Sequence, residues 1–526
     1  MTALVRDFLL RAAKAMPKKI AFYEGDRSID WATLNQRANL FAKALQKEGI
    51  GKGDVVGILS HEHIEIYEAF HGCLKLGAPR VGINWRFSPK EMLYVIKDSN
   101  AKVVLVQANC VELMGDLPEK LASEGIILIG YGGEHELPYD YEKLLSSSDI
   151  DVTLPEIHND DLAAISYTSG TTGSPKGVLL SQVALREAMM NTVLNLGLAP
   201  NDVWYAPTSS AWITFVLITM NTVNGMTSVL PEGDFDPDEY FAHINKHKVT
   251  VTIMVPIMMR RLIQLKEEKG IELPSLRLIT YGSSPSTPEL IRRATEAFGC
   301  DMSQLYGVTE ATGGWICVMS PEDTRRGLAG EEHLLRSCGR PTLHFDVEIR
   351  DDKDVVCPPD TIGEIWLRSD SVMTGYLGLE EQTNAALQGG WLCTNDLGYI
   401  DEEGFLYLTD RKNNLIITGS ANVFPSMVEN VLDEHENITE VAVVGVPHPE
   451  WDEAVVAVII AKNADAFDSD EVIAFSKTRM AKFEVPKALV LVDDLPKGLT
   501  GKVLKKDIQA MFKDGRLSVP WDFPSQ

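Results

Sequence analysis

The chain has 526 residues, of which 49 are Lys or Arg and 75 are Asp or Glu, so its formal net charge is −26. A hydrophobic fraction of 45% with 24% charged residues is typical of folded proteins and excludes a disordered chain. The acidic balance argues against a nucleic-acid-binding protein, which needs clustered Lys and Arg, but it permits an anionic ligand bound by one local loop.

The N-terminal part of the chain has the pattern of a parallel α/β protein. Residues 1–19 mix apolar and charged residues, which predicts an amphipathic helix rather than a signal peptide. Up to about residue 160, helical stretches alternate with short β-branched runs such as 55–59 (VVGIL) and 103–106 (VVLV). This alternation predicts βαβ units and a mostly parallel sheet.

Residues 203–231 contain no charged side chain and are numerous enough to span a bilayer. Pro207 and many polar residues interrupt the segment, so we expect no transmembrane helix but a buried helix and strand that line an apolar pocket. Further on, 250–255 and 276–282 are predicted strands. A helix is predicted over 286–299, capped by Ser286 or Thr287.

The pattern changes after about residue 340 to β-rich sequence with many turns. Beyond Arg411 a shorter α+β pattern follows, with apolar runs at 441–447 and 454–461 that we expect helical stretches to separate. The predicted fold class is α/β, with a large N-terminal lobe of mixed parallel sheets and helices plus a β-rich subdomain over 1–410. A small α+β C-terminal lobe is predicted over 411–526.

The seven cysteines form no CxxC pair and are odd in number. This pattern argues against a zinc site or a disulfide framework and fits a reducing compartment, so the predicted location is cytoplasmic.

The strongest local signal is the string from Tyr167 to Gly177 (YTSGTTGSPKG). Its glycines, hydroxyl residues and final Lys176 make a loop rich in backbone and side-chain donors, which suits a polyphosphate. It is not a Walker A loop, because Pro175 and not glycine precedes the lysine.

Five motifs in order resemble those of the adenylate-forming enzymes, a family that includes acyl-CoA synthetases, peptide-synthetase adenylation domains and luciferase. The resemblance spans essentially the whole chain. The motifs lie at Tyr167–Gly177, Gln304–Thr312, Trp391–Asp396, Asp410–Lys412 and Pro496–Lys502.

The resemblance implies a nucleotide site. Glu310 would hold Mg²⁺, although a lone glutamate is more often a solvated surface carboxylate, and magnesium takes few protein carboxylates beside substrate phosphates. Tyr306 would stack on adenine or else be a packed core aromatic. The pair Asp396 and Arg411 would bind ribose or else form an ordinary ion pair. The implied nucleotide-binding residues are Thr168, Ser169, Gly170, Thr171, Thr172, Gly173, Lys176, Gly282, Ser283, Ser284, Tyr306, Gly307, Thr309, Asp396, Arg411 and Lys502.

Lys502 is the implied catalytic lysine, together with Lys176 and Glu310. A lysine in such a turn is usually only a solubilising charge. Here its ammonium would bridge the substrate carboxylate and the α-phosphate, because attack of one anion on another needs a cation that contacts both. The family's C-terminal lobe moves between two steps, so the small lobe is expected to be mobile.

The chain departs from the family pattern near the implied acceptor tunnel, which would be flanked by Gly419, Ser420 and Ala421. Ser420 and Ala421 replace residues that are usually a glycine and a glutamate. Asn395 stands where a glycine usually precedes Asp396, and Asn413 stands at the position that the resemblance implies is the pivot between the lobes.

The acid pocket is expected in the apolar segment. Trp212, Phe215, Met220 and Trp315 are candidate walls, and core packing is the equal alternative for each. The Ser209–Ser210 pair stands where fatty-acyl relatives often carry an aromatic residue and a histidine. A neutral aryl or medium-length acid is the expected substrate.

The leading prediction is an ATP-dependent carboxylate–CoA ligase that forms acyl-AMP and pyrophosphate and then transfers the acyl group to CoA. ATP, Mg²⁺ and CoA are the implied cofactors and co-substrates. The alternatives are transfer to an amine or to a carrier-protein thiol, luciferase-type oxidation, and a nucleotide-binding regulator without catalysis. A homodimer is compatible with the sequence.

Overall fold

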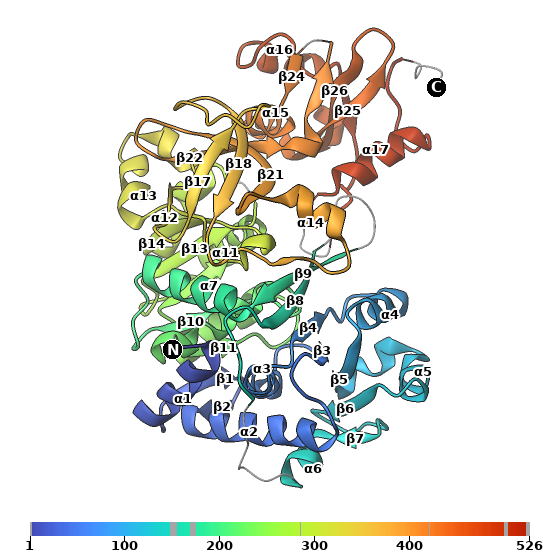
Figure 1. Ribbon diagram of the computed structural model, residues 1–526. Coiled ribbons are helices and arrows are strands. Elements are labelled where there is room, and N and C mark those ends of the chain that lie inside the picture. The colour runs from blue at the N-terminus through green and yellow to red at the C-terminus, as the bar shows by residue number, and fades with distance from the viewer. Residues whose placement is uncertain are drawn as a thin grey trace. The chain divides into compact units, whose positions relative to one another are not determined.

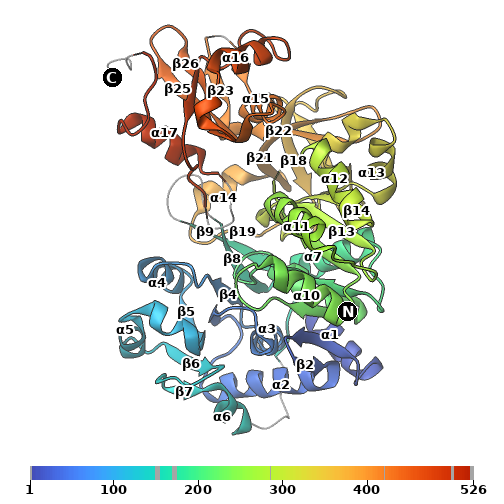
Figure 2. The ribbon, with the colours of Figure 1, turned by 180° about the vertical axis from the view of Figure 1, so that it is seen from behind.

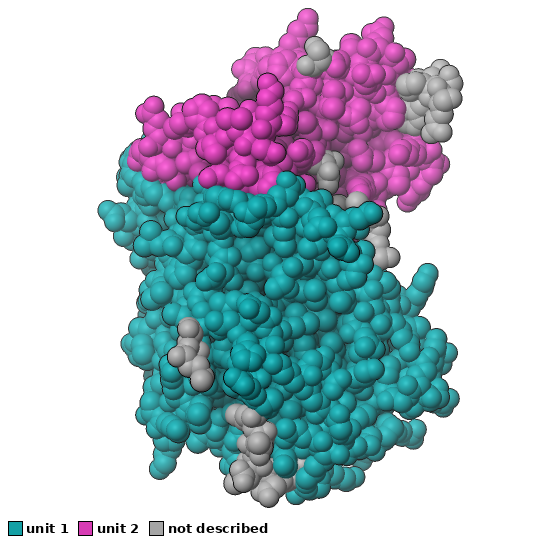
Figure 3. All heavy atoms as spheres, in the orientation of Figure 1, with its two compact units in different colours: residues 1–347, 367–393 teal, residues 348–366, 394–526 magenta. Residues whose placement is uncertain are grey.

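The computed structural model describes residues 3–147, 155–168, 175–284, 286–419, 421–498 and 503–521. The chain divides into two compact units, coloured separately in Figure 3. Unit 1 comprises residues 1–347 and 367–393, and unit 2 comprises residues 348–366 and 394–526.

Unit 1 contains two large sheets, whose strands are labelled in Figures 1 and 2. In the first sheet the strands from β1 to β14 are parallel, and β2, β15 and β16 add antiparallel edges. Its order is β16 (Arg340–Pro341), β15 (Cys317–Val318), β14 (Asp301–Tyr306), β13 (Leu278–Gly282), β12 (Val251–Met254), β10 (Val203–Tyr205), β11 (Thr227–Leu230), β1 (Ile20–Glu24) and β2 (Arg27–Asp30).

The second sheet is parallel from β8 to β7, and β9 and β19 are antiparallel additions at one edge. Its order is β19 (Gly375–Tyr376), β9 (Lys176–Ser181), β8 (Leu162–Thr168), β4 (Arg80–Ile83), β3 (Val55–Leu59), β5 (Ala101–Gln107), β6 (Ile127–Tyr131) and β7 (Tyr139–Asp140).

Helices pack on both sheets of unit 1. They are α1 (Val5–Ala15), α2 (Trp31–Lys47), α3 (Ile64–Leu76), α4 (Pro89–Asp98), α5 (Leu117–Ser123), α6 (Tyr141–Ser146), α7 (Gln182–Asn195), α8 (Phe215–Thr219), α9 (Asn221–Asn224), α10 (Pro237–His247), α11 (Pro256–Lys269), α12 (Pro288–Phe298), α13 (Pro321–Leu328) and α14 (Glu380–Ala386), with short 3₁₀ turns η1 (Ala108–Cys110), η2 (Glu112–Met114), η3 (Thr309–Ala311) and η4 (Glu332–Arg336).

Two further sheets complete the described chain. One has the order β17 (Asp346–Arg350), β18 (Gly363–Arg368), β21 (Trp391–Ile400) and β20 (Leu387–Gln388), with β22 (Leu406–Arg411) beside β21. The other, in unit 2, has the order β24 (Ala421–Val423), β23 (Ile416–Thr418), β26 (Asp452–Ala461) and β25 (Ile438–His448), with β27 (Ala488–Leu491) beside β26. The helical elements of unit 2 are η5 (Lys412–Asn414), α15 (Pro425–Leu432), η6 (Ala464–Ala466), α16 (Ser469–Lys477) and α17 (Lys505–Lys513).

Helix α12 shows how local sequence sets an element. The Thr287 hydroxyl accepts a hydrogen bond from the Leu290 amide (3.3 Å), and Pro288 occupies the first turn, where its missing N–H costs nothing. Gly299 ends the helix in the left-handed conformation, with φ at +65°. The predicted helix and its Thr287 cap are confirmed.

Helix α3 is buried along its whole length and packs against α1, α2 and β1. Most of its polar side chains are paired inside the protein, whereas both ring nitrogens of His71 make no hydrogen bond to a described residue. Burial raises the pKa of Glu68 to about 7, although Arg37 Nε lies 2.5 Å from its carboxylate and opposes the shift. Such a helix needs paired polar groups to be buried at an acceptable cost.

One local prediction is wrong. The apolar runs 441–447 and 454–461 belong to β25 and β26, which form an antiparallel hairpin without any helix between them. Only three residues, Pro449–Trp451, separate the two strands, and Asp452 adopts a left-handed φ of +60° at the start of β26. The link is too short for a helix.

The predicted fold class is confirmed: the chain is α/β, with a large N-terminal part of mixed parallel sheets and a smaller C-terminal β/α part. No helix among the described residues combines the length and hydrophobicity that crossing a bilayer requires. All seven cysteines are free thiols. Burial raises the pKa of Cys73 to about 12 and that of Cys110 to about 11.

Gly82 in β4 lets the sheet contact the segment that precedes α8. A Cβ at this position would lie 2.4 Å from the Ala211 carbonyl oxygen, which is backbone and not a movable side chain. We expect Gly82→Ala to lower the free energy of unfolding by about 1–3 kcal/mol, because the backbone must shift to relieve the overlap. Chemical denaturation measures this loss. Gly51→Ala is the matched control, since a Cβ at Gly51 meets nothing within 4 Å; equal losses in both variants would contradict the prediction.

Candidate active site

The predicted phosphate loop connects β8 and β9, an antiparallel pair that ends with Thr168 opposite Lys176. The central residues of the predicted loop, Ser169, Gly170, Thr171, Thr172 and Gly173, lie outside the described residues. Both ends of the loop are described, and Thr168 and Lys176 are half-buried.

The ends of this loop are fixed by α4. The Tyr94 hydroxyl donates a hydrogen bond to the Pro175 carbonyl oxygen (3.0 Å), and the Tyr167 hydroxyl donates one to Asp98 Oδ2 (2.6 Å). The two tyrosine rings also meet edge to face, with centroids 6.2 Å apart. These contacts hold the strands at the position from which Lys176 extends.

Lys176 and Glu310 both contact Tyr376 of β19. Lys176 Nζ lies 5.1 Å from the centroid of the Tyr376 ring, within the range of a cation–π contact. The Tyr376 hydroxyl donates a hydrogen bond to Glu310 Oε1 (2.9 Å). Two residues that the sequence assigned to the phosphates and to magnesium are thus brought together, whereas Tyr376 was not predicted.

The donor set at Glu310 fits magnesium. Glu310 is half-buried in η3, and among the described residues its second oxygen, Oε2, makes no hydrogen bond or ion pair. Magnesium usually takes one or two protein carboxylates and completes its coordination with substrate phosphates and water. Glu310 would therefore hold the ion through Oε2.

The predicted adenine-binding residues lie at the carboxyl ends of the neighbouring parallel strands β13 and β14, a usual place for ligands in α/β sheets. Gly282 pairs with Leu305, and a Cβ at Gly282 would lie 2.4 Å from the Leu305 carbonyl oxygen, so only glycine fits. Ser283 follows in the left-handed region, with φ at +68°. Ser283 and Ser284 are exposed, while Tyr306 is buried.

Gly307 and Thr309 continue from β14 toward Glu310. A Cβ at Gly307 would lie 2.8 Å from the Gly314 carbonyl oxygen, so the chain turns tightly here. The Thr309 carbonyl oxygen accepts a hydrogen bond from the Thr312 amide (2.9 Å), which closes the short turn that carries Glu310. The roles of these residues toward a nucleotide stay predictions.

Unit 2 carries the predicted ribose-binding pair. Asp396 in β21 lies opposite Arg411 in β22, and Arg411 Nε is 3.1 Å from Asp396 Oδ1. Asn395 adopts a left-handed φ of +60°. Asparagine tolerates this region better than other residues with a side chain, so the replacement of the usual glycine keeps the backbone geometry before Asp396.

The predicted acceptor and catalytic loops are only partly described. Gly419 is left-handed, with φ at +63°, and its amide donates to the Trp451 carbonyl oxygen (2.8 Å). Ala421 begins β24. Ser420 and the catalytic candidate Lys502 lie outside the described residues, so the acceptor tunnel and the role of Lys502 stay predictions.

The four candidate pocket walls differ in burial. Trp212 is half-buried and meets Phe87 edge to face, with centroids 5.8 Å apart. Trp315 is buried beside Gly307, while Phe215 and Met220 are sealed in the interior. Their contact with an acid is still a prediction, and Trp212 is the most accessible of them.

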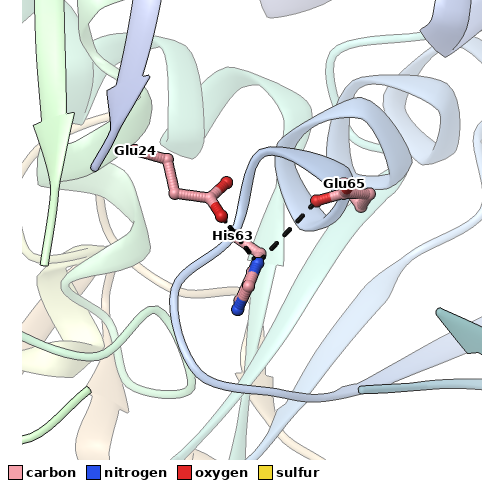
Figure 4. A group of neighbouring side chains, drawn as sticks. All are labelled: Glu24, His63 and Glu65. Carbon is pink, nitrogen blue, oxygen red and sulfur yellow. Dashed lines mark ion pairs between the residues drawn. The ribbon is translucent and has the colours of Figure 1, made fainter. Parts of the chain in front are cut away.

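A separate group of ligand-type side chains, Glu24, His63 and Glu65, comes together in unit 1 (Figure 4). Arg27 already pairs with both carboxylates, at 3.1 Å from Glu24 and 2.5 Å from Glu65. His63 Nδ1 lies 2.8 Å from Glu24 Oε1. Because Arg27 pairs with both carboxylates and His63 Nδ1 contacts Glu24, we interpret the group as an ion-pair network rather than a metal site.

The family of the chain follows from comparison with known proteins. The family model described as AMP-binding enzyme matches residues 9–377, and the model described as AMP-binding enzyme C-terminal domain matches residues 427–502. The chain therefore belongs to the AMP-binding enzyme family, and the predicted membership of the adenylate-forming class is confirmed.

Among the relatives, the chain is 32% identical over 507 residues to 2-succinylbenzoate–CoA ligase of Geobacillus kaustophilus, covering 96% of this chain and 97% of the relative. It is 31% identical over 514 residues to indoleacetate–CoA ligase of Aromatoleum aromaticum, covering 96% and 97%.

Two solved structures share the fold. The structure of o-succinylbenzoate coenzyme A synthetase from Bacillus subtilis, in complex with ATP and magnesium ion, has a TM-score of 0.83 at 28% identity and covers 95% of this chain and 99% of that one. An amide bond synthetase from Marinactinospora thermotolerans has a TM-score of 0.86 at 28% identity, with coverage of 96% and 99%.

The ion-pair network predicts a pH-dependent stability. Burial lowers the pKa of His63, but the contact with Glu24 and the charge of Glu65 outweigh it and raise the pKa above its ordinary value. The charged imidazolium therefore stabilises the fold below the unfolded-state pKa of about 6.5, and this contribution is lost as the pH rises through the folded-state pKa. We expect His63→Gln to cost on the order of 1–2 kcal/mol at pH 5.5 and less at pH 8.5.

Chemical denaturation of both proteins between these pH values measures the difference. His333→Gln is the control, because His333 is exposed in η4. A loss that is the same at pH 5.5 and pH 8.5 would show that His63 does not act through its charge.

Proposed function

We propose that this chain uses ATP to convert an aromatic or arylacetic carboxylic acid to its acyl-AMP, with release of pyrophosphate, and then transfers the acyl group to CoA. The class of enzyme, an AMP-forming acid–thiol ligase, is the one that its relatives define. The observation that carries the proposal is the placement of Lys176 and Glu310 on one tyrosine, because the first step needs a cation for phosphates and a carboxylate for magnesium at one place.

In the first step, a carboxylate oxygen of the acid attacks the α-phosphorus of ATP. The bond from that phosphorus to the oxygen bridging to the β-phosphate breaks, and pyrophosphate leaves with the electron pair. Lys176 binds phosphate oxygens, and Lys502 contacts the attacking carboxylate and the α-phosphate, so positive charge offsets the repulsion between the two anions. Magnesium, when bound at Glu310, neutralises phosphate charge.

In the second step, the thiolate of CoA attacks the acyl carbon and AMP leaves with the carboxyl oxygen. The C-terminal lobe over 411–526, predicted to be mobile, would withdraw Lys502 and admit the acceptor past Gly419 and Ala421. Seven free cysteines support a cytoplasmic location.

The aromatic substrate class is supported by the relatives that act on 2-succinylbenzoate and indoleacetate. Trp212 and Trp315 would supply flat apolar walls. The alternative acceptor is an amine, supported by the amide bond synthetase among the structural relatives and by Ser420 and Ala421 at the implied tunnel.

A panel of aromatic, arylacetic and aliphatic acids tests this proposal. We expect acid-dependent exchange of labelled pyrophosphate into ATP with an aromatic or arylacetic acid, and thioester formation when CoA is added. A product formed with amines but not with CoA would replace the acceptor, and an absence of exchange with every acid would overturn the proposed function.

Lys502→Ala separates the two steps. We expect adenylate formation to fall by at least about 100-fold, while thioester formation from supplied acyl-AMP stays close to wild type, because only the first step needs a cation between two anions. Lys506→Ala is the matched control, since Lys506 is an exposed lysine of α17. An equal loss in both steps would show that Lys502 does not leave the site between them.

A further inference from the structure

We propose that Tyr376 is a positioning residue, which orients the Glu310 carboxylate toward magnesium and the Lys176 ammonium toward the nucleotide phosphates. The inference rests on the proposed function. Tyr376 lies outside all five motifs by which the family was identified, and its two contacts arise from the folding of unit 1.

The position of Tyr376 is determined by strand pairing. Tyr376 of β19 pairs antiparallel with Val178 of β9, and Lys176 lies two residues before Val178 and so on the same face. Lys176 is therefore a diagonal cross-strand neighbour of Tyr376, close enough for a long side chain to reach the ring. The 5.1 Å separation of Nζ from the ring centroid agrees with this register.

The backbone around Tyr376 is held on both sides. The Tyr376 amide donates a hydrogen bond to the Thr383 hydroxyl of α14 (2.9 Å), and the Leu377 amide donates one to the Gly177 carbonyl oxygen (2.8 Å). A Cβ at Gly375 would lie 2.8 Å from Thr383 Cγ2. These contacts restrict the backbone that carries the Tyr376 side chain and so fix where the phenol points.

The same segment is attached to the turn that carries Glu310. The Met373 amide donates a hydrogen bond to the Glu310 carbonyl oxygen (2.8 Å), and the Thr312 hydroxyl donates one to the Ser371 carbonyl oxygen (2.5 Å). Residues 371–377 thus bind the η3 turn at one end and β9 at the other. One short segment sets the positions of both the carboxylate and the ammonium.

An uncharged phenol suits this positioning role, because it contacts both the Glu310 carboxylate and the Lys176 ammonium without neutralising either charge. In the network at Glu24 and Glu65, Arg27 pairs with both carboxylates and offsets part of their negative charge, which leaves less charge for a cation. At Glu310 the hydroxyl fixes Oε1 and leaves the negative charge for magnesium at Oε2. Lys176, which makes no ion pair with any described residue, keeps its charge for phosphate.

Tyr376→Phe removes the hydroxyl and keeps the ring. We expect it to raise the Mg²⁺ concentration needed for half-maximal pyrophosphate exchange about 10-fold, which is typical of the loss of a group that orients a metal ligand, and to leave the KM for the acid unchanged. Mn²⁺ binding in the presence of α,β-methylene-ATP, followed by electron paramagnetic resonance, should weaken by a similar factor without any turnover.

Tyr139→Phe is the matched control, because the Tyr139 hydroxyl also donates to a glutamate, Glu48 Oε2, at 2.9 Å, but Tyr139 lies in β7, at the edge of the sheet opposite to β19. This variant should bind Mn²⁺ as the wild type does. In a Glu310→Gln background, Tyr376→Phe should add little further loss of Mn²⁺ binding, since the carboxylate that it orients is gone.

The results distinguish a failure of the Tyr376 positioning role from a failure of the proposed ligase function. An active wild type whose Mn²⁺ affinity is unchanged by Tyr376→Phe would overturn the positioning role. Independent, additive losses from Glu310→Gln and Tyr376→Phe would overturn it as well. A wild type without pyrophosphate exchange for any acid would instead remove the proposed function.

Discussion

An enzyme that binds a magnesium–polyphosphate complex must keep a carboxylate and an ammonium group near each other while preventing them from forming an ion pair. Coulomb attraction favours such a pair strongly wherever water is partly excluded. In unit 1, Glu310 and Lys176 meet different parts of one phenol, the hydroxyl and the ring face. The register of β19 against β9 and the backbone bonds of residues 371–377 all serve to hold that phenol, so this separation of charge is the constraint around which the local structure is built.

The sequence predicted the elements whose signals are local. The run 55–59 corresponds to β3 because a continuous β-branched run is typical of a strand buried on both faces, and α12 follows its cap and its proline. Contacts between residues that are far apart in the chain were not predictable from the sequence. Tyr376 gains its role by pairing with Val178, far away in the chain, and no spacing within the string around it indicates that contact. Similarly, an apolar run does not distinguish a pocket wall from core, so Phe215 and Met220 could be placed in the interior only by the structure.

Departures from a family pattern can preserve geometry even when they change chemistry. Asn395 replaces a glycine and still adopts the left-handed conformation, so the backbone that leads to Asp396 in unit 2 keeps its turn. The Asp396–Arg411 pair then follows from the register of β21 and β22. Conformation rather than residue identity is what this position requires.

The burial of cysteines matters because an enzyme that forms an activated acyl group can be acylated by its own product. Acyl-AMP is a mixed anhydride and reacts with thiolates. The enzyme must therefore transfer the acyl group to the thiol of CoA and not to its own cysteines. Cys73 and Cys110 are buried, and burial raises the pKa of each thiol far above neutral pH. Almost no nucleophilic thiolate therefore forms at either residue. These side chains are thereby protected from self-acylation, and the same seclusion should make them slow to react with alkylating reagents.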